Sequence, residues 1–405
     1  MGGVSMEWKE VTLGDLCEIS SSKRIFAKEY QSDGVPFYRG KEIIAKQKGN
    51  AISNELFISR NQYEEIKARY GVPQQQELLL TSVGTLGVPY VIKEEEFYFK
   101  DGNLTWFRHF NGLDVEYLYY WFLSPYGKNE INTKAIGSTQ KALTIDSLSK
   151  FDIKIPANLD DQRRIASILS SLDRKIELNN KINADLEEMA QAIFKNWFVD
   201  FEPFKDGKFV DSELGMIPEG WKVVVFDNIL KVTTTKTGKE GIPEYSVTNT
   251  GIHPRDEKFT KNLSKSSAKN KLIRKGNLVF GMSREILNWG IMKEEVGGVS
   301  SAYNVYIVDE KIVNTTYLEC FIAQRMDYFA DLIKPASREG QGVDKALLMK
   351  KIICIPPSEV MDVFLEKYNS IKLLTEIRNQ ESSRLSLLRD TLLPRLMSGE
   401  LEVPE

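Results

Sequence analysis

Two stretches of the chain carry apolar residues at the spacing of a long paired helix. Between Asp160 and Trp197, one heptad register holds Ile165, Leu172, Leu186 and Ile193, and the other holds Ile168, Ile182 and Met189. Beyond residue 358, the same spacing places Phe364, Ile371, Leu385 and Leu392 in one register and Leu374 and Leu388 in the other. Apolar heptads sustained over several repeats are typical of coiled coils. The pattern predicts two long helices, the first of roughly 33 residues and about 50 Å.

Polar residues interrupt both heptad patterns near the middle. Asn179 takes a core position of the first pattern, and Arg378 and Glu381 interrupt the second. Asn179 could pair with one of these residues and fix the register of an antiparallel pair. It could equally mark a solvated position where the pattern slips. Two amphipathic helices, each packed on its own globule, are the alternative to pairing.

The rest of the chain mixes short strand-like runs with short helical patterns, which indicates an α+β fold. Gly and Asp-Gly or Asn-Gly pairs separate the runs. Strands are expected at Val88–Ile92, Phe97–Phe99 and Leu104–Arg108, and again at Val223–Phe226, Leu278–Phe280 and Val305–Val308. Helices are expected at Asn61–Arg69, Val115–Leu123 and Thr316–Ala330.

The two strand-rich stretches resemble each other in sequence. Trp8-Lys9 returns as Trp221-Lys222, Lys141-Ala142-Leu143 as Lys345-Ala346-Leu347, and Ile153-Lys154-Ile155-Pro156 as Ile353-Cys354-Ile355-Pro356. A repeat of this length indicates duplicated domains rather than a solenoid. The expected organisation is a first globule at 1–157, a helix and linker at 158–213, a second globule at 214–357, and a helix and tail at 358–405. If the helices pair antiparallel, the globules lie at opposite ends and are related by an approximate twofold axis. They could then address sites about one turn of B-DNA apart, or about 34 Å.

Composition narrows the class of protein. The 405 residues, 42% of them hydrophobic, suffice for roughly two to four domains. No apolar run reaches the roughly 18 residues of a membrane span, and Met1 to Ser5 lacks the features of a secretory signal. Cys17, Cys320 and Cys354 are odd in number and far apart, which favours reduced thiols in a cytoplasmic protein over disulfides or a zinc site.

Positive charge is concentrated in the second globule, although the whole chain has a formal net charge of −3. Residues 214–357 hold 21 basic and 16 acidic side chains. Phosphate binding depends on local cationic density, so nucleic acid remains a possible partner. A solvated lysine-rich surface explains the charge equally well.

Loops that combine small, amide and basic residues recur in both globules. Arg and Lys read guanine edges, Asn and Gln read adenine, and Ser and Thr hold phosphates. Candidate DNA contacts are Lys23, Arg24, Arg39, Gln140 and Lys141 in the first globule, and Lys236, Arg284, Arg338 and Gln341 in the second.

Sequence motifs for catalysis are missing. The chain has no G-x-x-x-x-G-K-[ST] loop, no G-x-G-x-x-G fingerprint and no H-E-x-x-H pair, and it has two histidines. The sequence therefore predicts no catalytic residue, no resident metal and no bound cofactor.

Several phrases together resemble the specificity subunits of type I restriction–modification systems, over almost the whole length. Both globules open with a W-K…L-G-D-L-like phrase, Trp8-Lys9…Leu13-Gly14-Asp15-Leu16 being the nearer match. Ile155-Pro156…Gln162-Arg163-Arg164-Ile165-Ala166 and the ending Leu388 to Leu401 are more specific. The second helix departs from the family pattern at Ser358-Glu359-Val360, where a Gln-rich start is usual.

The resemblance implies a DNA-reading subunit without catalytic activity. Each globule would be a target recognition domain for half of a bipartite duplex site, and the paired helices would set the spacing. Two methyltransferase subunits would dock on the helices, and restriction subunits would join the full complex. S-adenosylmethionine, ATP and Mg²⁺ would be bound by those partners. The expected spacer core is Ile165, Leu172, Ile176, Asn179, Ile371, Leu385 and Leu388. The alternatives are a methyltransferase or nuclease with an unfamiliar active site, and a scaffold whose globules bind proteins.

Overall fold

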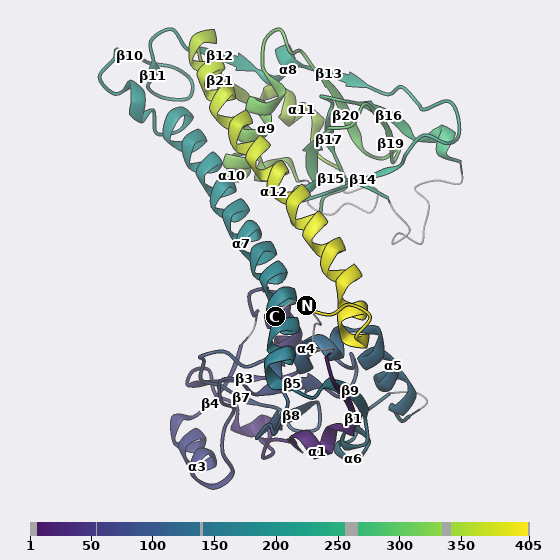
Figure 1. Ribbon diagram of the computed structural model, residues 1–405. Coiled ribbons are helices and arrows are strands. Elements are labelled where there is room, and N and C mark those ends of the chain that lie inside the picture. Colours follow the sequence, from purple (N-terminus) through teal and green to yellow (C-terminus); the bar gives the residue numbers. More distant parts are fainter. Residues whose placement is uncertain (1–5, 54, 138–140, 256–265, 334–341, 404–405) are drawn as a thin grey trace. The chain divides into compact units, whose positions relative to one another are not determined.

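The computed structural model describes residues 6–403 except 54, 138–140, 256–265 and 334–341 (Figure 1). The chain divides into two compact units. Unit 1 comprises Met1–Ile182 and Ile377–Glu405, and unit 2 comprises Asn183–Glu376. Each unit therefore contains one globule together with a part of each long helix. The four-segment division expected from the sequence stays a prediction.

Unit 1 is built on a four-stranded antiparallel sheet in the order β2-β8-β5-β6. A separate pair, β1-β9, and a three-stranded sheet, β4-β3-β7, complete its strands. The strands are β1 Trp8–Thr12, β2 Glu18–Ser20, β3 Val35–Tyr38, β4 Leu56–Ile58, β5 Leu78–Thr81, β6 Pro89–Val91, β7 Tyr98–Phe99, β8 Leu104–Arg108 and β9 Asp152–Pro156. The helices are α1 Leu13–Leu16, α2 Gly40–Gln47, α3 Arg60–Tyr70, α4 Val115–Leu123, α5 Pro125–Lys134 and α6 Ile145–Ser149, with a 3-10 turn η1 at Ala27–Glu29.

Both faces of the β5 strand are covered, which explains its uninterrupted apolar sequence. Leu78 and Leu80 pack in a core with residues of α4, whereas Leu79 faces a second core that contains Phe99 and Trp106. Successive side chains of a strand point to opposite faces, so one strand serves two cores.

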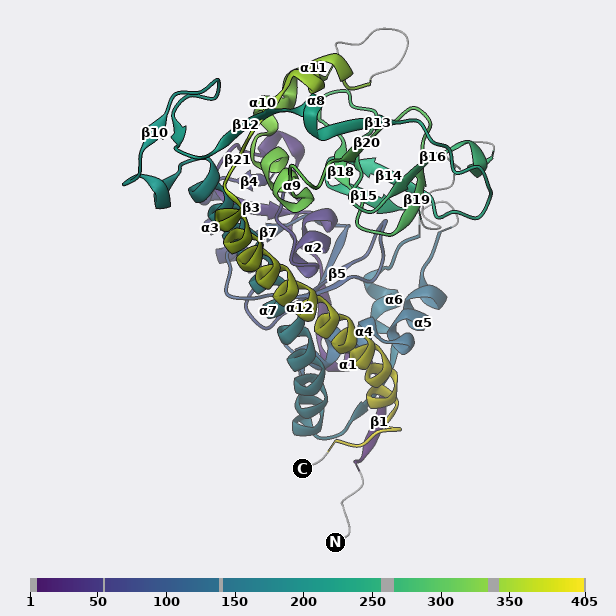
Figure 2. The same ribbon diagram turned by 90° about the horizontal axis from the view of Figure 1, so that it is seen from above.

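Unit 2 repeats this plan with the sheet order β13-β20-β17-β18 and the pair β12-β21. Its strands are β10 Phe209–Val210, β11 Ile217–Pro218, β12 Lys222–Val225, β13 Leu230–Thr233, β14 Tyr245–Thr248, β15 Gly251–Pro254, β16 Lys271–Arg274, β17 Leu278–Phe280, β18 Trp289–Ile291, β19 Val296–Val299, β20 Asn304–Val308 and β21 Ile352–Ile355. Its helices are α8 Phe226–Ile229, α9 Thr315–Gln324, α10 Met326–Phe329 and α11 Lys345–Lys350, with 3-10 turns at Glu202–Phe204, Ser267–Lys269 and Ala330–Leu332. Helix α9 lies against the sheet (Figure 2), and its Tyr317 and Leu318 share a core with Leu278 and Phe280.

Matching hydrogen bonds confirm that the two globules are copies of one fold. The amide of Leu13 donates to the Phe151 carbonyl at 3.0 Å, and the amide of Phe226 donates to Lys351 at 2.8 Å. The hydroxyl of Tyr117 donates to the Lys154 carbonyl at 3.4 Å. In the same place in unit 2, the Tyr317 hydroxyl donates to the Cys354 carbonyl at 2.6 Å.

One of the sequence matches was wrong by a few positions. Thr144 caps α6 by accepting from Ser147, and Asp344 caps α11 by accepting from Leu347, so these two residues are equivalent. The equivalent of Lys141 is therefore Gln341, outside the described residues, and Lys345 lies inside a helix instead. The two Lys-Ala-Leu sequences are alike but not structurally equivalent, whereas the helix N-caps are equivalent and give the structural alignment.

The two long helices pair antiparallel in each unit taken by itself. They are α7, Leu159–Phe198, with 40 residues, and α12, Ser358–Ser398, with 41. In unit 1, Arg389 donates to Asp173 at 2.5 Å and the Asn179 amide donates to Glu381 at 2.8 Å. In unit 2, Lys372 contacts Glu187 at 2.8 Å. Residue numbers rise along one helix as they fall along the other, which confirms pairing and the partner expected for Asn179.

Six of the seven expected spacer-core residues are at least half buried, and Leu388 is a correction. Ile165, Asn179 and Ile371 are buried, and Leu172, Ile176 and Leu385 are half-buried. Leu388, however, is 46% exposed. On each helix, the first of the two predicted rows of inward-facing residues was right. The second row lies one position further along the helix than predicted. Polar residues such as Thr375, Ser382 and Arg389 take the inner places on α12, and a search for apolar residues alone passed over them.

The three cysteines are free, and we expect them to react slowly. Burial raises the pKa of Cys17, Cys320 and Cys354 to about 12 in each case. Because the thiolate is the nucleophile, alkylation at pH 8 should be slow in the folded protein and complete in denaturant. Mass spectrometry of iodoacetamide-treated protein measures this. Rapid labelling of a native cysteine would contradict the burial of its thiol.

Within the described part of the chain, no helix has the length and apolar character needed to cross a membrane. In the same residues, no group of three or more His, Cys, Asp or Glu side chains is placed to hold a metal ion.

Candidate nucleic-acid interface

Several loops of unit 1 meet at one end of the four-stranded sheet, and together we name them loop cluster 1 (residues 21–26, 39–41, 82–88, 100–103 and 141–143). Strands β2 and β5 end there because both run antiparallel to β8, which begins there. The Ser22 hydroxyl donates to the Phe99 carbonyl at 2.7 Å, and the Lys100 amide donates to Tyr38 at 2.9 Å. The Leu143 amide donates to Ser82 at 2.9 Å. Loops far apart in sequence thus form one surface.

The basic residues expected from the sequence lie in this cluster, but not all are equally available. Lys23 and Lys141 are exposed, and Lys23 lies 5.3 Å from the ring centre of Tyr70. Arg24 is 2.7 Å from the Asp101 carboxylate, so part of its charge is neutralised within the protein. Gln140 lies outside the described residues.

Arg39 is held in a fixed position by a buried carboxylate. Glu42 accepts from the Arg39 backbone amide at 2.9 Å, from Nε at 3.2 Å and from Nη2 at 2.6 Å. The Glu42 side chain is 1% exposed and that of Arg39 is 30% exposed. Burial raises the pKa of Glu42, but the hydrogen bonds from Arg39 outweigh it and lower the pKa below its usual value. Sequence reasoning identified Arg39 but missed Glu42, although an acidic residue three positions after a helix start is a capping signal.

Unit 2 has a corresponding surface, loop cluster 2, formed by residues 234–239, 281–288 and the start of β16. Lys236 forms an isolated β-bridge with Lys271. Arg284 is exposed on the loop between β17 and β18. Asn288 braces that loop, because its amide side chain donates to the Met282 carbonyl at 2.5 Å and its backbone amide to the Ser283 hydroxyl at 2.8 Å. Arg338 and Gln341 lie outside the described residues.

Lys271 also belongs to this cluster, although it is not among the DNA contacts expected from the sequence. It is half-buried and donates to the Tyr303 carbonyl at 2.5 Å. Burial lowers its pKa, and the nearby positive charge of Lys345 lowers it further. A lysine in such surroundings is stabilised when an anion approaches, so the arrangement suits a phosphate group.

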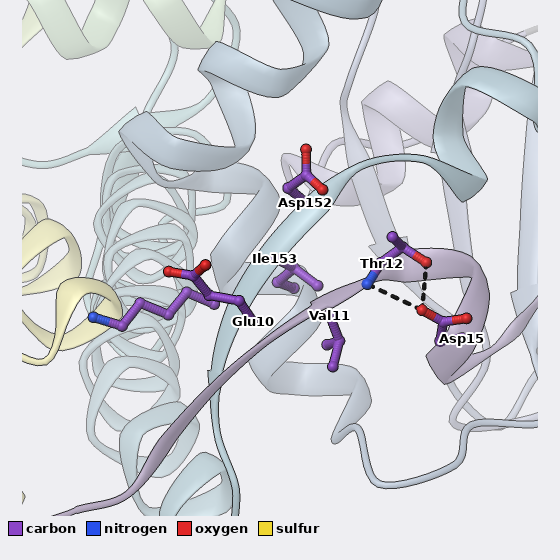
Figure 3. Close-up of a pocket in the computed structure, with 7 residues that line it drawn as sticks. Glu10, Val11, Thr12, Asp15, Asp152 and Ile153 are labelled. Carbon is purple, nitrogen blue, oxygen red and sulfur yellow. Dashed lines mark hydrogen bonds between the residues drawn. The ribbon is translucent and has the colours of Figure 1, made fainter.

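A hollow in unit 1 that is lined by three acidic side chains lies away from these loops (Figure 3). It measures about 550 Å³ and is lined by residues of β1, α1 and β9, including Glu10, Asp15 and Asp152. The three carboxylates point in different directions (Figure 3), and Asp15 accepts hydrogen bonds from the Thr12 amide at 3.2 Å and hydroxyl at 2.6 Å. Asp15 is therefore a helix cap. Lys154 also lines the hollow, but three carboxylates outnumber it, and they do not converge as a ligand set.

Comparison with known proteins gives a consistent result. Residues 6–188 match the family model described as the type I restriction modification DNA specificity domain. The chain is 27% identical over 431 residues to the type I restriction enzyme MjaIX specificity subunit of Methanocaldococcus jannaschii, covering 100% of this chain and 96% of that protein. It is 25% identical over 330 residues to the HindI specificity subunit of Haemophilus influenzae, covering 64% and 71%.

Solved structures share the fold. The crystal structure of the type I restriction–modification S subunit from M. genitalium has a TM-score of 0.53 at 15% identity, covering 96% of both chains. A chain from a study of assembly and conformational transition in the type I R-M system has a TM-score of 0.54 at 13% identity, covering 98% of this chain and 100% of that one. The duplicated globules, the two long helices and these relatives agree: residues 6–188 match a type I restriction modification DNA specificity domain, and the whole chain is similar to type I specificity subunits.

Proposed function

We propose that each globule of this chain reads one part of a two-part duplex DNA site, without catalysing a reaction itself. The observation that carries the proposal is the repeated sheet with a loop cluster at the same end in both copies. The two clusters present different side chains, such as Arg39 and Lys141 in one and Lys236 and Arg284 in the other. Equivalent scaffolds with unlike loops suit two unlike half-sites.

We propose a spacer role for α7 and α12. Each helix spans about 60 Å at 1.5 Å per residue, more than the roughly 34 Å of one turn of B-DNA. Both helices are tied to the globules: Ile165 and Leu393 belong to the core of unit 1, and Phe194 and Phe364 to that of unit 2. A helix anchored at its ends by buried residues resists sliding, as a device that sets a fixed gap requires.

Catalysis belongs, in this proposal, to partner subunits in the cytoplasm. Methyltransferase subunits would dock on the helices and restriction subunits would join them, supplying the sites for S-adenosylmethionine, ATP and Mg²⁺. The isolated chain should transfer no methyl group from labelled S-adenosylmethionine and cut no plasmid with Mg²⁺. Turnover by the purified chain would overturn this part.

Mapping methylated adenines in the source genome by long-read sequencing tests the two-part readout. We expect a split motif with a constant gap that disappears when the gene for this chain is deleted. A contiguous palindrome that depends on this chain would contradict the proposal. Footprinting of the complex with its methyltransferase should show two protected blocks, whereas a protein-binding scaffold would show none.

A lysine of loop cluster 2 gives a quantitative prediction. Replacing Lys236 by glutamine removes one phosphate contact, so binding should weaken about equally for all DNA sequences. The slope of log affinity against log salt concentration should fall by about one unit. Fluorescence anisotropy of the methyltransferase complex on duplex DNA, at several salt concentrations, measures both effects. Lys208→Gln, an exposed lysine outside the cluster, is the control, and an equal change in both variants would contradict the assignment.

A further inference from the structure

The guanidinium of Arg39 is oriented before any DNA binds. Arg39 follows β3 and immediately precedes α2, within loop cluster 1. Its Nε and Nη2 both donate to Glu42, so the plane of the guanidinium is fixed along one edge. A group held in this way loses little conformational entropy on binding a further partner.

The pairing with Glu42 leaves a particular edge of the guanidinium available. Each terminal nitrogen of arginine carries two hydrogens, and a side-on pair through Nε and Nη2 uses one hydrogen of Nη2. The end-on edge, with one N–H from Nη1 and one from Nη2, is not used by any contact among the described residues. Two parallel donors match the O6 and N7 acceptors of guanine in the major groove, whereas adenine offers a donor at the position of O6.

Glu42 does more than cap a helix. To cap α2, Glu42 needs only to accept from the Arg39 backbone amide, which it does at 2.9 Å. The further bonds to the guanidinium neutralise the charge of Arg39, so this pair adds little general attraction to phosphate. A buried carboxylate that orients an arginine contributes to selectivity rather than to overall affinity.

The second globule lacks this device. Phe37 and Glu244 occupy equivalent places, since each pairs in parallel with the segment that precedes β8 or β20. The residue equivalent to Arg39 is therefore Ser246, which is buried and accepts from Arg255 at 2.7 Å. The contact is specific to the first globule.

We propose that Arg39 reads a guanine in the half-site contacted by the first globule, and that Glu42 is its positioning residue. The inference rests on the proposed DNA-reading function. It predicts that the methylation motif of the wild-type complex contains at least one guanine in one half-site whose recognition depends on Arg39.

Methylation motifs of variant complexes test the proposal. Arg39→Ala should admit other bases at one guanine of one half-site, with the gap and the other half-site unchanged. In competition binding with duplexes substituted at that position, discrimination should fall by about 10- to 100-fold. Arg39→Lys keeps a charge but loses the planar fork, so it should retain part of the discrimination. Glu42→Gln should relax the same position, and Lys48→Gln, at the other end of α2, should leave the motif as it is.

Different results separate the possible errors. An unchanged motif in a folded Arg39→Ala complex overturns the assignment, as does weakening that is equal for every substituted duplex. If the alanine variant does not fold, Arg39→Lys and Glu42→Gln decide the matter by the same measurement. The absence of a split motif in the wild type would instead contradict the proposed function.

Discussion

Replacement of Phe194 by alanine is expected to lower the free energy of unfolding of unit 2 by about 3–5 kcal/mol. Phe194 lies near the end of α7 and is 1% exposed. Its ring centre is 5.0 Å from that of Phe198, 5.4 Å from Tyr317 and 5.8 Å from Phe364. One side chain thus joins α7, α9 and α12, and its removal leaves a cavity between rings that cannot close over it.

Urea denaturation measures this loss of stability. Hydrogen exchange in peptides from α9 and the start of α12 tests whether the loss arises within unit 2. Met189→Ala is the matched control, since Met189 lies five residues earlier on the same helix and is 52% exposed. We expect a change below about 0.5 kcal/mol for the control. Equal losses in the two variants would show that the aromatic cluster does not carry the attachment of the helix.

The pattern of apolar residues predicted six of the strands, β6, β7, β8, β12, β17 and β20, because these strands are short and strongly apolar. Helix Val115–Leu123 and strand Leu278–Phe280 were predicted with their observed bounds. The helix expected over Thr316–Ala330 instead breaks at Arg325, whose backbone is not helical, and continues as α10. Nothing in the composition of that segment marks the break, which allows Phe329 to turn into the core.

The helix interface was only half predictable. A heptad search finds apolar residues, so it located the rows that contain Ile165 and Ile371. It could not find the row where Arg389 donates to Asp173, because that contact depends on a residue far away in the sequence. The prediction for Asn179 succeeded since a polar residue in an apolar row requires a polar partner.

The candidate interface divides in the same way. Basic and amide residues in loops could be identified from the sequence, and the structure brings the basic ones of the first globule to one surface. Two carboxylates neutralise some of these basic residues: Asp101 lies beside Arg24, and Glu42 lies beside Arg39. Neither pair could be inferred from the sequence, because Asp101 is far from Arg24 in the chain and Glu42 resembles an ordinary surface acid. Only the structure therefore shows which of these basic side chains are paired with a carboxylate and so are less available to DNA.

Replacement of Gln162 by methionine is expected to detach the start of α7 from the first globule. The Gln162 side chain is fully buried. Its Oε1 accepts from the Asp114 amide at 2.8 Å, and its Nε2 donates to the carbonyls of Gly112 at 3.0 Å and Pro156 at 2.9 Å. These bonds connect the helix to the loop before α4 and to the end of β9, and methionine can form none of them.

The second globule shows that methionine fits such a place only among different neighbours. Met361 lies three residues before Phe364, just as Gln162 lies three residues before Ile165, and Met361 packs in an apolar core. In unit 1, methionine would leave one amide and two carbonyls buried without partners, at a cost of about 2–4 kcal/mol. Thermal unfolding and amide hydrogen exchange at Asp114 measure the loss of stability. The control is Arg163→Met, at the exposed neighbouring residue. A loss below about 1 kcal/mol would mean that water replaces the amide, and the helix would then be anchored by Ile165 and its apolar neighbours alone.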